Sequence, residues 1–295
     1  MNVRLFLYRR PTLRRILAPL LAVRRALIAL RTERFVRAWS RYSDLVSADP
    51  VLRLIEFEGE FSVGARSHVA RRVMLDGTYE DGLARRWIAF ADPNRDVIDV
   101  GANVGFYAVL AARHLRRGTV FAIEPNPSAC RRLRHNLALN DVESSAVVVQ
   151  AIATETAGRA TLYTVPGLDE YSSAVTPLHP AVGRETPVVL SVEALTIDDL
   201  VAENDLDVGL MKVDVEGSEL SVLRGASRVL AEHRPVILVE VGTGTRHQSA
   251  AANKVFDLLR DHGYELTYPQ APGLPVSTGA FEGVLCVPGE RAELQ

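Results

Sequence analysis

A glycine loop that directly follows an apolar stretch is the segment best suited to hold a ligand. It reads Asp99-Val100-Gly101-Ala102-Asn103-Val104-Gly105, and a helix is expected to begin at its end. Gly101 and Gly105 permit a tight turn and a close approach to the backbone. The helix start offers unpaired N–H groups and the positive end of a dipole. Glu124 follows at the end of the next predicted strand, where a carboxylate can accept both hydroxyls of a ribose. The pattern indicates a nucleoside-containing cofactor.

The same loop differs from loops that bind dinucleotides. Those loops read G-x-G-x-x-G around a pyrophosphate, whereas here Asn103 stands where the second glycine is needed. S-adenosylmethionine has no phosphate but carries an ammonium, a carboxylate and a sulfonium. Asp99 suits the ammonium, and the N–H groups of the loop suit the carboxylate. We therefore expect S-adenosylmethionine as the cofactor, and an NAD-dependent oxidoreductase on a similar sheet is the alternative.

A second group of candidate residues follows two later strands. Asp214 and Glu216 have the same strand parity, so they point to one side if the strand extends that far, and Glu240 ends the neighbouring strand. One of these carboxylates could act as general base for a substrate hydroxyl. Alternatively, two or three could hold a divalent cation that lowers the pKa of the hydroxyl. His247, in the loop after the fifth strand, is a further candidate base, or else an exposed loop residue.

These candidates require an open α/β sheet to bring them together. Apolar strand-like runs are expected at 96–100, 119–124, 146–151, 208–214, 235–241, 264–268 and 281–287. Helical runs are expected at 105–115, 127–139, 196–203, 219–232 and 250–262. The alternation predicts right-handed βαβ units in a Rossmann-like, mostly parallel sheet with helices on both faces.

Two further segments complete this organisation. Residues 51–80 are expected to form short strands joined by turns. Residues 164–187, which include Tyr171-Ser172-Ser173, are rich in Pro, Gly, Ser and Thr and are expected to form a long loop of the kind that often covers a site.

The composition fits a globular enzyme, with 47% hydrophobic and 24% charged residues. The two cysteines, Cys130 and Cys286, are far apart, which excludes a disulfide framework and favours a reducing, cytoplasmic setting. No apolar run approaches the ~20 residues that a membrane-spanning helix needs.

The charge is concentrated at the start of the chain. Residues 1–45 carry eleven arginines against Glu33 and Asp44, so the rest of the chain is acidic and a nucleic-acid partner is not expected. Residues 12–38 predict an amphipathic helix, broken or kinked at Pro19, that could lie on the inner face of an anionic membrane. The alternatives are a helix packed on the body or on a second subunit, and a membrane-associated scaffold without catalytic activity. We expect a basic arm over 1–45, an extension or cap over 46–90 and a cofactor-binding domain over 91–290.

Six stretches of the chain resemble the FkbM-type methyltransferases, which are class I S-adenosylmethionine-dependent enzymes. The stretches are Val97–Tyr107, Ala122–Pro127, Thr196–Leu200, Met211–Glu219, Val222–Ala226 and Val239–Val241. The resemblance implies a seven-stranded sheet whose last strand is antiparallel. It also implies methyl transfer to a hydroxyl oxygen of a small molecule, namely a sugar, another secondary metabolite or a glycolipid.

The resemblance also implies roles for individual residues. The residues at the methionine end of the cofactor are Asp99, Gly101, Asn103 and Gly105. Glu124 holds the ribose with Asn126 beside it, and Glu80, ahead of the first strand, resembles a residue on the cofactor side. Ile152 and Glu155 depart from the family's pattern, so the adenine contacts are left unassigned.

Overall fold

The computed structural model describes residues 49–64, 67, 69–70, 72–73, 79–80, 82–165, 172–174, 186–241, 246–269, 276 and 283–294. Of residues 246–249 and 292–294 only the backbone is described. The helix expected over residues 12–38 and the basic arm lie outside these residues.

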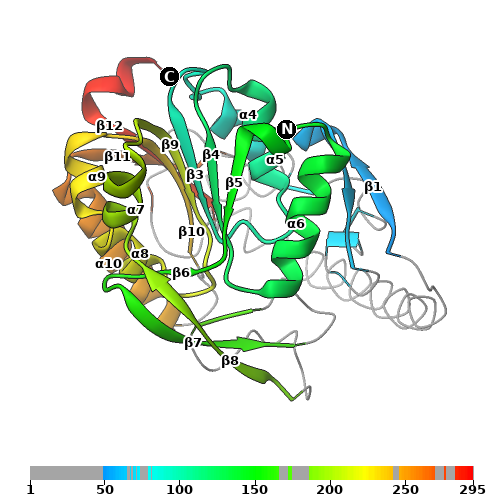
Figure 1. Ribbon diagram of the computed structural model, residues 1–295. Coiled ribbons are helices and arrows are strands. Elements are labelled where there is room, and N and C mark those ends of the chain that lie inside the picture. The colour runs from blue at the N-terminus through cyan, green and yellow to red at the C-terminus, as the bar shows by residue number, and fades with distance from the viewer. Residues whose placement is uncertain are drawn as a thin grey trace, which may run out of the picture.

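A twisted sheet of seven strands forms the centre of the molecule (Figure 1), in the order β11-β12-β10-β9-β3-β4-β5. The strands are β3 (Asp96–Val100), β4 (Val120–Ile123), β5 (Ala146–Val149), β9 (Val208–Val213), β10 (Val236–Glu240), β11 (Tyr264–Thr267) and β12 (Gly283–Pro288). The pairs β10–β9, β9–β3, β3–β4 and β4–β5 are parallel, whereas β12 is antiparallel to both of its neighbours. The expected Rossmann-like sheet, with an antiparallel last strand, is confirmed.

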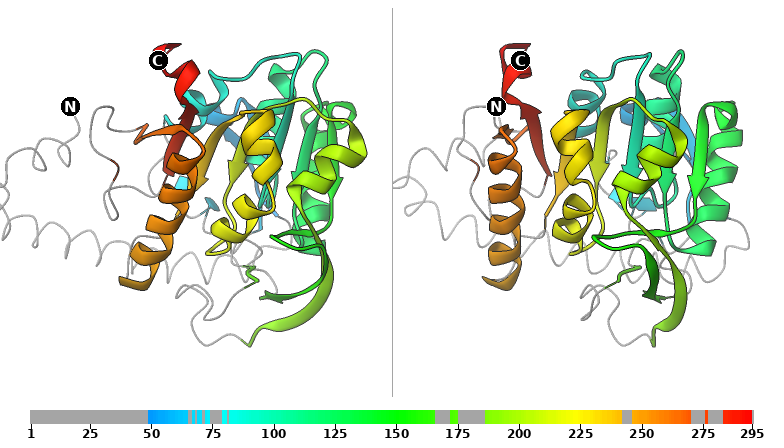
Figure 2. Two further views of the ribbon diagram at one scale, coloured as in Figure 1. Left: turned by 90° about the vertical axis from the view of Figure 1, so that its left-hand side faces the viewer. Right: turned by 60° about the vertical axis from the view of Figure 1, so that its left-hand side comes forward.

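Helices cover both faces of this sheet (Figures 1 and 2). One face is covered by α4 (Leu83–Ile88), α5 (Phe106–His114) and α6 (Pro127–Leu139), and the other by α7 (Ile197–Asn204), α8 (Glu219–Arg224), α9 (Ser227–Glu232) and α10 (Arg246–Asp261). Neighbouring strand residues accordingly belong to two separate cores. Val97 packs in the core of α4 and α5, and Ile98 packs in the core of α7 to α10. This alternation explains why the strands are apolar at almost every position.

The single helix expected over 219–232 is wrong, because the segment forms two helices, α8 and α9. A Cβ on Gly225 would lie 2.0 Å from the carbonyl oxygen of Thr154, so the chain at this point is pressed against another loop. The backbone turns at Gly225 and Ala226, and the second helix starts in a new direction.

A smaller sheet lies at the carboxyl ends of the main strands (Figure 1). It contains β6 (Ile152–Ala153), β8 (Val188–Leu195) and β7 (Gly158–Thr164), in that order. These strands were not expected from the sequence, because β7 is largely polar and alternately exposed. In the stretch expected to be a long loop, Ser173 pairs with Tyr163 of β7 through two backbone hydrogen bonds.

An N-terminal hairpin packs against α6. It consists of β1 (Val51–Leu54), a short 3-10 turn, η1 (Ile55–Phe57), and β2 (Gly59–Ser62). The amide of Asn136 accepts from the N–H of Ser62, and the amide of Asn140 accepts from the N–H of Glu60. Strands were expected throughout residues 51–80, but residues 69–70 and 72–73 are helical. Two further 3-10 turns are η2 (Glu143–Ser145) and η5 (Gly289–Leu294). No helix in the described part of the chain is long and apolar enough to span a membrane.

Candidate active site

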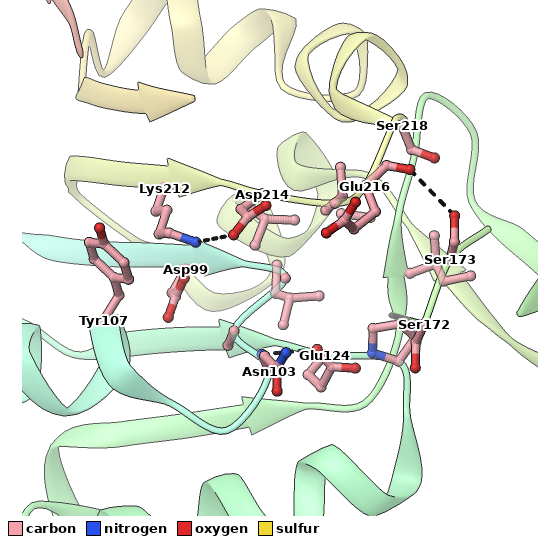
Figure 3. A pocket seen from close by; sticks show the side chains of 18 of the residues that line it. Asp99, Asn103, Tyr107, Glu124, Ser172, Ser173, Lys212, Asp214, Glu216 and Ser218 are labelled. Carbon is pink, nitrogen blue, oxygen red and sulfur yellow. Dashed lines mark hydrogen bonds and ion pairs between the residues drawn. The ribbon is translucent and has the colours of Figure 1, made fainter. Parts of the chain in front are cut away.

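A cavity lies at the carboxyl ends of β3, β4 and β9, between the main sheet and the smaller one (Figure 3). Its walls come from the glycine loop, the segment after β4, the loop after β9 and residues 172–174. Carboxyl ends of parallel strands are where ligands bind in open α/β sheets. The carboxylates of Asp99, Glu124, Asp214 and Glu216 all reach this cavity.

The two glycines of the loop are required by the packing of the chain. Gly101 has φ of +79°, and a Cβ there would lie 1.8 Å from the carbonyl oxygen of Asp214. Gly105 has φ of +94°, and a Cβ there would lie 2.3 Å from Cδ1 of Leu133. Gly101 therefore lets the loop after β9 approach the glycine loop, and Gly105 lets α6 approach the start of α5. Gly105 itself is not among the described residues that line the cavity.

Most N–H groups of the loop are already used within the protein. Gly101 and Ala102 donate to the carbonyl of Ile123, and Gly105 donates to the carbonyl of Ala102. Asn103, with φ of +51°, donates to Oε2 of Glu124 at 2.9 Å. These four N–H groups therefore already have partners within the protein, and their contact with the carboxylate of the cofactor stays a prediction.

Asp99 is a buried carboxylate that faces the cavity. It is 1% exposed, and neither of its oxygens makes a hydrogen bond of normal geometry with the described residues. Burial raises the pKa of Asp99 to about 6, although the charge of Lys212 and the N–H of Ala108 lower it. An unpaired buried carboxylate is costly, so this site favours a cationic ligand that offers N–H donors.

Glu124 is held in a fixed orientation at the other end of the cavity. Its Oε2 accepts from the N–H of Asn103, and its Oε1 accepts from the N–H of Asn126 at 2.8 Å. A carboxylate oxygen can accept more than one hydrogen bond, so a carboxylate held in this orientation is a suitable acceptor for ribose hydroxyls.

Asn126 positions the segments around Glu124. Its Oδ1 caps α6 by accepting from Ser128, and its Nδ2 donates to Oγ of Ser172 at 2.9 Å. Asn126 is buried and is not among the described residues that line the cavity, unlike Ser172.

The loop after β9 places two more carboxylates in the cavity. Hydrogen bonds of this loop, and not strand parity, set their positions. The strand ends at Val213, and Glu216 has φ of +52°, so strand parity does not orient Asp214 and Glu216. Instead, the N–H of Asp214 donates to the carbonyl of Val100, and the hydroxyl of Ser173 donates to the carbonyl of Glu216. Asp214 also forms an ion pair with Lys212, with 2.8 Å between Nζ and Oδ2.

The remaining candidates from the sequence are Glu240, His247 and a metal site. Glu240 is not among the described lining residues, but its charge raises the pKa of three residues that line the cavity, Tyr79, Tyr107 and Lys212. His247 falls in the first turn of α10, and its side chain is outside the described part of the structure. Among the described residues, no group of three His, Cys, Asp or Glu side chains is arranged to hold a metal ion.

Glu80 does line the cavity, on the side of Asp99. The hydroxyl of Tyr107 donates to Oε2 of Glu80 at 2.5 Å, and burial raises the pKa of that carboxyl. The sequence reasoning gave Tyr107 and Tyr79 no role, yet both line the cavity. Only one feature of the sequence indicated that Tyr107 could reach the site. It lies in the first turn of the helix that follows the glycine loop.

Other stretches that resemble the family have structural roles. The hydroxyl of Thr196 caps α7 by accepting from Asp199. The carboxylate of Asp198 accepts from the N–H groups of Arg228 and Val229 and so caps α9.

Comparisons with known proteins agree with this architecture. Residues 99–266, more than half of the chain, match the model of the methyltransferase FkbM domain. The chain is 30% identical over 212 residues to methyltransferase sdnD of Sordaria araneosa, covering 64% of this chain and 80% of that protein.

Two further relatives carry more specific names. The chain is 26% identical to the 31-O-demethyl-FK506 methyltransferase FkbM of Streptomyces tacrolimicus, over 72% of this chain and 86% of the relative. It is 29% identical to the hexuronic acid methyltransferase AglP of Haloferax volcanii, over 64% of this chain and 72% of the relative. Neither a dehydrogenase nor a scaffold without catalytic activity fits these matches. The chain belongs to the FkbM methyltransferase family, and it is a methyltransferase.

Proposed function

We propose that this methyltransferase uses S-adenosylmethionine to methylate a hydroxyl oxygen of a small molecule, namely a sugar, another secondary metabolite or a glycolipid. The observation that carries this proposal is the pair of carboxylates at the two ends of the cavity. Asp99 lacks a hydrogen-bond partner among the described residues, and Glu124 is oriented by two N–H groups. S-adenosylmethionine offers one ammonium and one ribose diol, which match these two carboxylates.

The residues of the cavity fit this cofactor better than a dinucleotide. Asp99 would hold the ammonium and Glu124 the ribose hydroxyls, while the cofactor supplies a methyl group on a sulfonium sulfur, which is a good leaving group. A pyrophosphate would need free N–H groups in the glycine loop, but those of Gly101, Ala102 and Asn103 are already paired. A buried, partly negative cavity also disfavours phosphate.

Asp214 is the residue best placed to receive the proton of the acceptor hydroxyl. Its Oδ2 is paired with Lys212, whereas Oδ1 has no hydrogen-bond partner within the described part of the chain. Its side chain is 32% exposed and lines the cavity. Glu216 lines the same wall and is the second candidate. General bases contribute about 10²–10⁴-fold to such reactions, and orientation of the reactants contributes more.

The acceptor class is supported by the names of two relatives, a hexuronic acid methyltransferase and a 31-O-demethyl-FK506 methyltransferase. Both names refer to small-molecule acceptors, and the first refers to a sugar acid. Peripheral membrane contact through residues 12–38, use of a divalent cation and oligomer formation are separate hypotheses.

Calorimetric titration tests the cofactor. We expect S-adenosylhomocysteine to bind and NAD to produce no heat of binding. Transfer of a labelled methyl group to hexuronic acids and to other polyhydroxylated acceptors then tests the reaction, and EDTA in a parallel assay tests the need for a divalent cation. Binding of NAD without S-adenosylhomocysteine would overturn the proposal.

A further inference from the structure

Lys212 lies at the centre of the cavity's charged wall, on the strand next to Asp99. In the parallel pair β3–β9, Asp99 and Lys212 are register partners, so their side chains leave the same face of the sheet side by side. Lys212 is 3% exposed, its Nζ lies 2.8 Å from Oδ2 of Asp214, and the same Nζ lies 4.6 Å from the centre of the Tyr107 ring (Figure 3).

Four carboxylates act on this one ammonium group. Burial alone lowers the pKa of Lys212, but Asp214, Glu240, Asp99 and Glu80 raise it, and the net direction is upward. Lys212 is therefore a permanent cation. It is the only lysine or arginine among the described residues that line the cavity. Without it, the neighbouring carboxylates would repel one another in a buried site, and at least one would take up a proton.

Purely structural roles do not account well for this lysine. Buried ion pairs contribute little net stability, because removing two charges from water offsets their attraction. Replacing both partners by apolar residues is often neutral, whereas removing one partner alone leaves a buried charge unpaired and is destabilising. The fold also anchors the backbone of Asp214 without Lys212, through the bond to Val100 and the contact with Gly101.

We propose that Lys212 is a positioning residue whose charge is shared between Asp99, the anchor for the cofactor's ammonium, and Asp214, the carboxylate on the acceptor side. It keeps Asp99 ionised so that the ammonium can bind, and it turns Asp214 so that Oδ1 faces the cavity. This role rests on the proposed function, since it assigns a task to Lys212 within that same site.

The charged and titratable groups around Asp99 determine the pH at which this carboxylate takes up a proton. They are Lys212 on β9, Asp214 in the following loop, Glu80 and Tyr79 ahead of α4, and Tyr107 on α5. The charge of Glu240 raises the pKa of three members of this set, Lys212, Tyr79 and Tyr107. Lys212 is the member of the set whose charge favours the ionised form of Asp99.

The test is the pH dependence of S-adenosylhomocysteine binding, measured by calorimetry on the full chain. The wild type should lose affinity as the pH falls through about 6, where Asp99 takes up its proton. Lys212→Met should move this midpoint upward by about one pH unit, which weakens binding about twofold at pH 7 and about tenfold near pH 5, and leaves it nearly unchanged above pH 8. Lys212→Arg, which keeps the charge, should keep the wild-type midpoint.

Melting temperatures and a second variant separate this role from a structural one. Lys212→Met leaves buried carboxylates without their cation, so its melting temperature without ligand should fall, but the protein should remain folded at the temperature of the titration. If that variant does not fold, Lys212→Gln, whose amide can still donate to Asp214, should show the same upward shift of the midpoint.

An unchanged midpoint in the neutral variant would overturn the proposal for Lys212, as would a loss of affinity that is equal at every pH. Absence of binding by the wild type at every pH would instead overturn the proposed function itself.

Discussion

Asp99 shows how a single buried group links the sequence to the proposed chemistry. Its position two residues before Gly101 predicted a contact with an ammonium group, and the structure leaves its oxygens without a normal hydrogen bond among the described residues. The cost of burying this carboxylate is visible in its pKa, which burial raises to about 6. The site is thus arranged to be stabilised when a cation binds.

Replacing Asp99 by Asn should weaken binding of S-adenosylhomocysteine while stabilising the free protein. We expect binding to lose about 1–3 kcal/mol, the cost of removing a charged partner from a buried group. Glu124→Gln should lose a similar amount, whereas Glu155→Gln, on the exposed loop after β6, should lose none. Calorimetry on the three variants measures this, and equal affinities throughout would remove both carboxylates from the cofactor site.

The stability of the free protein should respond to Asp99 in the opposite sense. The folded pKa of about 6 exceeds the ordinary value of 3.8, so the folded state binds the proton first and loses stability as the pH rises through this window. The advantage of Asp99→Asn over the wild type should therefore be about 1 kcal/mol smaller near pH 5 than near pH 7. Urea unfolding at both pH values measures the difference, and a constant difference would contradict the raised pKa.

At the residue scale the sequence revealed the groups that lie within short motifs. Asp99, Glu124 and Asp214 all line the cavity, as expected from their positions at strand ends. The bond from Tyr107 to Glu80 joins residues 27 positions apart, and the pairing of Asp99 with Lys212 depends on strand order. Such contacts form only in the folded chain, so no short sequence motif predicts them.

At the element scale, the glycine loop and the loop after β9 form one unit. The missing Cβ of Gly101 admits the carbonyl of Asp214, and the N–H of Asp214 pairs with the carbonyl of Val100. The same two loops carry Asp99 and Asp214. A change in either loop should therefore move the cofactor side and the acceptor side together.

Gly101→Ala tests this unit, and Gly82→Ala is its matched control. Both glycines have φ near +80°, so alanine costs about 1–2 kcal/mol of backbone strain at either position. No atom lies within 4 Å of a Cβ at Gly82, whereas Gly101 meets the carbonyl of Asp214. We expect Gly101→Ala to lose a further 1–3 kcal/mol of unfolding free energy, roughly the cost of overpacking, and most of its methyl transfer. Equal losses in urea unfolding would contradict the close contact.

Asp198 supports a second element, because it caps α9 from the neighbouring helix α7. Asp198→Ala removes two acceptors of backbone N–H groups and should cost about 0.5–2 kcal/mol of unfolding free energy. Asp199→Ala changes a neighbouring exposed carboxylate and should stay within about 0.5 kcal/mol of the wild type. Cofactor affinity should be the same in both variants. Equal stability of the two variants would show that the cap contributes nothing.

Most elements of the main sheet followed from the alternation of apolar runs and helical patterns. Strand β3 and helix α6 have the expected bounds, because an apolar run and an N-cap with proline mark them locally. The smaller sheet did not follow, because β7 and β8 are half exposed and are stabilised by pairing with each other. The break between α8 and α9 depends on the contact of Gly225 with Thr154, which is distant in the chain.

For the whole molecule, charge separates the first 45 residues from the rest. The arm is strongly basic, and every residue that we propose to contact the cofactor lies after residue 79. Removal of residues 1–45 should leave S-adenosylhomocysteine affinity within about twofold and abolish flotation with anionic vesicles, an attraction that salt screens. Flotation that does not depend on the arm would contradict membrane contact through residues 12–38.

The most direct measurement is a crystal structure of the full chain with S-adenosylhomocysteine. We predict that its amino group lies within hydrogen-bond distance of Asp99 and that both ribose hydroxyls lie on Glu124, with the sulfur facing Asp214. A ligand that binds away from these two carboxylates, or a cavity that admits no nucleoside, would contradict the central claim.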